Sequence, residues 1–97
     1  MVVVQRPMQR DEQSPEGLAP IVVTHAGVAH DELTDPVARS FVESLQRETE
    51  ASLAALLPQI VAEGGQVRVE VPPDYGDADV FVYGMSAALM SAVLAAL

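Results

Sequence analysis

Residues 66–71 have the sequence Gln-Val-Arg-Val-Glu-Val, in which polar and apolar side chains alternate without exception. This period of two predicts a β-strand with one buried and one polar face. Two prolines at 72 and 73 end the strand, and turn-forming residues follow over 74–77. Residues 80–83, Val-Phe-Val-Tyr, predict the next strand, and the short link between the two strands permits a hairpin.

A long helix is expected immediately before the alternating strand. Asp35 is a favourable N-cap residue and Pro36 fits the first turn, so the helix should begin there. Apolar side chains then recur at intervals of three and four residues and predict one buried stripe: Val37, Phe41, Val42, Leu45, Leu53, Leu56, Leu57, Ile60 and Val61. Pro58 has no N–H to donate, so the helix should bend or restart near it. Gly64-Gly65 is expected to terminate it.

An earlier strand is predicted over residues 20–25, where the β-branched run Ile-Val-Val lies between a proline and a glycine. The order is then β-α-β-β-α, with a parallel crossover between the first two strands. We therefore expect an α/β fold, a small two-layer sandwich with a three- or four-stranded sheet and two helices on one face. The other face should carry Arg68, Glu70 and further polar groups, or be covered by a second copy.

The domain organisation expected is an N-terminal tail or arm over residues 1–19 and a single α/β domain over residues 20–97. Residues 1–20 include three prolines and few large apolar side chains, which favours a flexible tail. Its stretch Val2–Val4 could add an edge strand to a partner's sheet.

Composition excludes several classes of function. The 97 residues include 14 carboxylates, 5 arginines and no lysine, for a formal net charge of −9, which argues against nucleic-acid binding. Without cysteine there is no disulfide, thiol nucleophile or cysteine-based metal site. The N-terminus matches no secretory or transit peptide, so we expect a soluble, cytoplasmic protein.

Residues 80–97 carry no charge, and three interpretations compete for the helix expected over 85–97. A membrane tail anchor would need about twenty apolar residues and usually basic flanks, which are missing. A second interpretation is a helix buried inside a monomer. The favoured one packs a large-residue face on the sheet (Leu89, Met90, Val93, Leu94 and Leu97) and presents a small-residue face to another chain (Ala88, Ser91, Ala92 and Ala95).

Two groups of residues could carry chemistry. His25, His30 and Asp31 follow the first predicted strand and could bind a divalent metal such as zinc, or supply a general base. No known ligand spacing is matched, and ordinary solvated loop chemistry is the favoured interpretation of these residues. The carboxylates over 74–79 could attract calcium or magnesium, although acidic turns are common in acidic proteins. No catalytic residue is assigned.

The function expected is a non-enzymatic interaction or assembly module. It would self-associate through the C-terminal helix as a homo-oligomer, or bind a protein partner as a subunit of a larger, including phage-like, assembly. No cofactor is expected in that case. The alternative is a small metal-dependent enzyme or ligand-binding domain that uses the loop of His25, His30 and Asp31.

Overall fold

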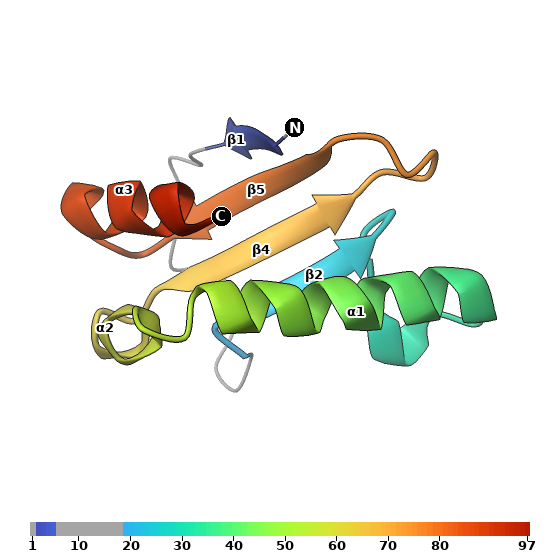
Figure 1. Cartoon of the computed structure of the whole chain (residues 1–97), viewed down its shortest axis with the longest axis horizontal. Helices are drawn as coiled ribbons and strands as arrows, with labels where there is room; N and C mark the ends of the chain where they lie inside the picture. Colours follow the sequence, from blue (N-terminus) through green and yellow to red (C-terminus); the bar gives the residue numbers. More distant parts are fainter. Residues whose placement is uncertain (1, 6–18) are drawn as a thin grey trace.

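The computed structural model describes residues 2–5 and 19–97, which form two layers (Figure 1). One layer is a mixed five-stranded sheet in the order β1-β5-β4-β2-β3. Its strands are β1 (Val2–Gln5), β2 (Ile21–His25), β3 (Val28–Ala29), β4 (Gln66–Val71) and β5 (Ala78–Tyr83). The helices are the 3₁₀-helix η1 (His30–Glu32), α1 (Pro36–Ser52), α2 (Leu57–Ala62) and α3 (Ala87–Ala96).

The topology confirms the predicted α/β class. Strands β2 and β4 are parallel neighbours connected through α1 and α2, and β4 and β5 form an antiparallel hairpin. The sheet has five strands, one more than the expected maximum of four, because two short strands lie at its edges. Strand β3 pairs with the end of β2, and β1 pairs in parallel with β5.

The predicted N-terminal tail can be compared with the structure at only a few positions. Val2–Gln5 joins the sheet of its own chain by pairing with β5. Residues 1 and 6–18 lie outside the described residues.

The long predicted helix is interrupted, as the proline indicated. Helix α1 begins after Asp35, whose Oδ1 accepts a hydrogen bond from the Val37 N–H at 3.0 Å. It ends at Ser52, and a tight turn over residues 53–56 leads into α2. Pro58 lies in the first turn of α2, where its missing N–H costs no helical hydrogen bond.

The end of α2 is closed by the two glycines. Gly64 has a φ of +73°, a conformation that costs glycine little. The N–H of Gly65 donates to the Ile60 carbonyl at 2.8 Å, and that of Gly64 donates to the Val61 carbonyl at 3.0 Å. This is the Schellman arrangement, and it turns the chain directly into β4.

One face of the sheet holds the core. The strands contribute seven buried aliphatic residues: Ile21, Val23, Val67, Val69, Val71, Val80 and Val82. The α-helices contribute Val42, Ile60, Leu89 and Val93 to the same cluster, and the turn between α1 and α2 contributes Leu53. All three α-helices therefore cover the same face. The prediction of a buried stripe is wrong at its two ends, because Val37 and Val61 are exposed.

The other face carries the polar side chains of the alternating strands. Arg68 and Glu70 lie there, as predicted, with Nη2 of Arg68 3.8 Å from Oε1 of Glu70. Phe81 is the β5 partner of Arg68, and the guanidinium lies 5.1 Å from the centre of its ring. This cation–π contact ties β4 to β5 on the side opposite the helices.

A matched pair of valines tests how the core is placed. Val42 is fully buried, whereas Val37 on the same helix is 69% exposed. We expect Val42→Ala to lower the free energy of unfolding by about 2 kcal/mol, because it removes buried methyl groups and leaves a cavity. Val37→Ala should change it by less than about 0.5 kcal/mol. Urea denaturation measures both, and equal effects would contradict the assigned core.

Candidate functional site

The C-terminal helix is divided into a buried and an exposed side. Leu89 and Val93 are 2% and 0% exposed and pack in the core. The predicted small-residue side faces outward, with Ala88, Ser91 and Ala95 exposed and Ala92 partly buried. Ser86 caps the helix by accepting a hydrogen bond from the Leu89 N–H at 3.2 Å.

Within residues 2–5 and 19–97, no helix combines the length and the apolar character needed to cross a bilayer.

His25 is positioned by a tight turn at the end of β2. Ala26 and Gly27 connect β2 to β3 with φ values of +52° and +83°, which resembles a two-residue hairpin turn of type I′. The Ala26 N–H donates to the carbonyl of Val71 at 2.9 Å. His25 thus lies where the parallel strands β2 and β4 both end, an edge at which α/β sheets often place ligands.

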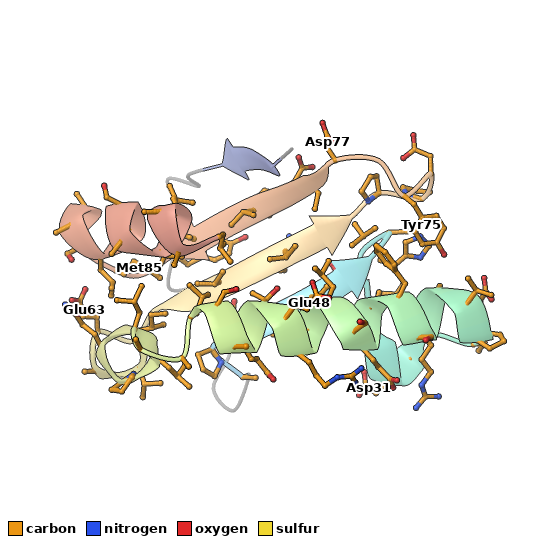
Figure 2. The ribbon with its side chains drawn as sticks, in the orientation of Figure 1. Asp31, Glu48, Glu63, Tyr75, Asp77 and Met85 are labelled. Atoms are coloured by element: carbon orange, nitrogen blue, oxygen red, sulfur yellow. The ribbon has the colours of Figure 1, made fainter. Side chains whose placement is uncertain are left out.

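The His25 ring lies at one end of a group of three rings from different elements. It stacks on Tyr75 with the ring centres 4.7 Å apart, and Phe41 of α1 meets Tyr75 edge-on at 5.3 Å. Figure 2 shows Tyr75 in the β4–β5 loop, beside α1. Tyr75 has a φ of +60°, which is uncommon for an aromatic residue. The aromatic contacts hold this loop against α1.

The histidine and acidic residues do not assemble into a metal site in the part of the chain that the structure describes. No three side chains of histidine, aspartate or glutamate are grouped there so as to hold an ion. The side chain of His30 lies outside that part. Of the predicted group of His25, His30 and Asp31, the structure therefore places only the side chains of His25 and Asp31. His25 lies on the aromatic stack, while Asp31 lines a groove beside β2.

Two features of His25 and the neighbouring loop bear on chemistry. Nε2 of His25 is buried and makes no hydrogen bond to the described residues. Asp74, one of the predicted acidic group, accepts the Gly76 N–H on Oδ1 at 3.0 Å. That carboxylate is used to form the turn, as the ordinary interpretation of an acidic loop expects.

Sequence analysis missed the role of Gln46. Its Oε1 accepts the Val23 N–H at 2.9 Å, and its Nε2 donates to the Ile21 carbonyl at 2.7 Å. The same Nε2 donates to Oε2 of Glu50 at 2.9 Å. The available signal was its spacing, since Gln46 follows the buried Val42 by one helical turn and so places an amide next to the apolar stripe.

A groove between α1 and the end of α3 is too small to indicate a ligand site. It encloses about 170 Å³, whereas ligand pockets usually begin near 300 Å³. Val69 and Val80 form part of its lining, with Leu45 and Leu97 beside them. Glu48, which is labelled in Figure 2, also lines it. We assign no function to this groove.

No protein-family model, curated protein or solved structure matches this chain, so the functional argument rests on its own residues.

The aromatic stack makes a testable contribution to stability. We expect Tyr75→Ala to lower the free energy of unfolding by about 1–2 kcal/mol, because contacts to two rings are lost. Tyr75→Phe keeps both ring contacts and serves as the control, with an expected change below about 0.5 kcal/mol. Thermal or urea unfolding followed by circular dichroism measures these values. An unchanged stability in the alanine variant would show that the stack does not hold the loop.

Proposed function

We propose that this chain is a non-enzymatic interaction or assembly module that self-associates through α3. The observation that carries the proposal is the outer side of this helix, where Ala88, Ser91 and Ala95 are exposed and no residue is charged. Small side chains allow two backbones to approach closely without burying a polar group that lacks a partner.

The rest of the chain supports the same proposal. The described residues form one small core, and domains of this size often gain stability by association. The opposite side of α3 is already used by the core through Leu89 and Val93, so only the small-residue side is available to another molecule. A subunit of a larger assembly would use the helix in the same way.

Charge introduced on the outer side of α3 tests the proposal. We expect the unmodified chain to sediment above its monomer mass, and the double variant Ala88→Glu with Ala95→Glu to sediment as a folded monomer. Glutamates facing each other across the contact would be buried without partners. Ser40→Glu places the same charge on an exposed position of α1 and should leave the mass unchanged. A monomeric unmodified chain would overturn the proposal.

A metal-dependent enzyme or ligand-binding domain remains the alternative proposal, with His25, His30 and Asp31 as its residues. One observation favours it, namely the buried Nε2 of His25, which no described residue hydrogen-bonds. An imidazole nitrogen in that state could receive a ligand or a metal ion.

Zinc titration distinguishes the two proposals. The assembly module should give no binding heat with zinc and no rise in melting temperature. The double variant His25→Ala with His30→Ala should then keep the oligomeric mass of the unmodified chain. Stoichiometric zinc binding that this double variant abolishes would favour the alternative and count against the assembly module.

A further inference from the structure

The outer edge of β2 is only partly paired. β3 pairs with Thr24 and His25, and the chain then turns away into η1 at His30. On this side, Ile21–Val23 has no neighbouring strand among the residues that the structure describes. Its inner side is fully paired with β4. An unpaired strand edge of this kind is a template for another chain.

Gln46 occupies the hydrogen-bonding groups of that edge. The Ile21 carbonyl and the Val23 N–H both point to its side-chain amide, at 2.7 and 2.9 Å. In a parallel ladder, the one residue opposite Val22 would bond to both of these groups, and in an antiparallel ladder the two residues that flank it would bond to one each. The Gln46 amide therefore substitutes for one residue of a missing strand. It also closes the edge while no strand is bound.

A groove runs beside this edge and gives an incoming backbone room. It encloses about 320 Å³ and is lined by Ile21–Val23 of β2 together with Ala19, Ala29, Asp31, Gln46 and Glu50. In Figure 2, Asp31 lies below α1, on the side away from α3. The groove is thus separate from the helix face that is proposed to self-associate.

The charges beside the groove favour a basic occupant. Asp31 and Glu50 are both exposed, and none of the arginines that the structure describes lines the groove. Glu50 now accepts a hydrogen bond from Gln46, and it would lose this donor if Gln46 moved aside. A lysine or arginine on the incoming strand would replace that donor with a charged one. A second copy paired through the same edge would instead bring its own Asp31 and Glu50 close to these carboxylates.

We propose that the outer edge of β2 is a docking site for an extended, lysine- or arginine-bearing segment of a partner protein. The segment adds to the sheet as a strand by displacing the Gln46 amide from Ile21 and Val23. This inference rests on the proposed function as an interaction module, and it uses a surface other than α3.

The test uses the full chain labelled with ¹⁵N and a seven-residue peptide that alternates lysine and valine, blocked at both ends. We expect this probe to bind Gln46→Ala about tenfold more tightly than the unmodified chain, because two hydrogen bonds no longer have to be broken. Chemical-shift changes should centre on Ile21–Val23. Without peptide, the Val23 amide should exchange faster in this variant, since it has lost its acceptor.

Three controls distinguish the effect of the Gln46 amide on binding from the effect of charge and from a general effect of substitution on the fold. Gln59→Ala makes the same chemical change at an exposed position of α2 and should bind the probe like the unmodified chain. The double variant Asp31→Asn with Glu50→Gln keeps Gln46 and should weaken binding several-fold. A probe with glutamate in place of lysine should bind neither protein.

The edge site is overturned if Gln46→Ala binds the probe no more tightly than Gln59→Ala, or if the shift changes lie on α3. It is also overturned if adding Gln46→Ala to the monomeric variant Ala88→Glu with Ala95→Glu makes that protein associate with itself in the absence of peptide, because a second copy would then be the occupant. Each of these results leaves the α3 experiment unaffected. If the double variant Ala88→Glu with Ala95→Glu keeps the mass of the unmodified chain, the proposed self-association through α3 is overturned. The proposed docking site on the outer edge of β2 is not affected by that result.

Discussion

The alternating pattern of β4 is the constraint on which the rest of the structure depends. This strand lies between β5 and β2, and its three valines are buried against the helices while Arg68 and Glu70 lie on the opposite face. A shift of one residue in its register would exchange these two sets of side chains. All three α-helices must therefore lie on one side of the sheet, α1 along the length of the strands and α3 near the end of β5 (Figure 1).

The placement of the two candidate sites follows from the same sheet. Because β2 and β4 are parallel, both end at one edge, where the turn after β2 meets the loop after β4 and His25 stacks on Tyr75. The outer side of β2 is left partly open because β3 is only two residues long. Gln46 reaches that opening from α1, which packs above the strand. The single strand β2 therefore serves both places: His25 at its end stacks on Tyr75, and Ile21 and Val23 near its start bind the Gln46 amide.

The sequence predicted those elements whose periodicity is strong. The alternation over 66–71, the cap at Asp35 and the restart near Pro58 all correspond to structure, because each depends on the chain's immediate neighbours. The side chain of Gln46 is different. Its two partners lie 23 and 25 residues away, and only the packing of α1 on β2 brings them together. The stack of His25 on Tyr75 likewise depends on tertiary structure, because the end of β2 and the loop after β4 come together only in the folded sheet.

The pairing of β1 has a consequence for synthesis on the ribosome. Val2 and Gln5 are made 76 residues before their partners Ala78 and Phe81, since 78 − 2 and 81 − 5 are both 76. Until residues 78–81 have emerged, the nascent first strand has no place in the sheet of its own chain. Strands β2 and β4 can already pair by then, with α1 between them. The order of synthesis therefore makes β1 the final strand to complete the sheet, and the edge of β5 stays open until it does.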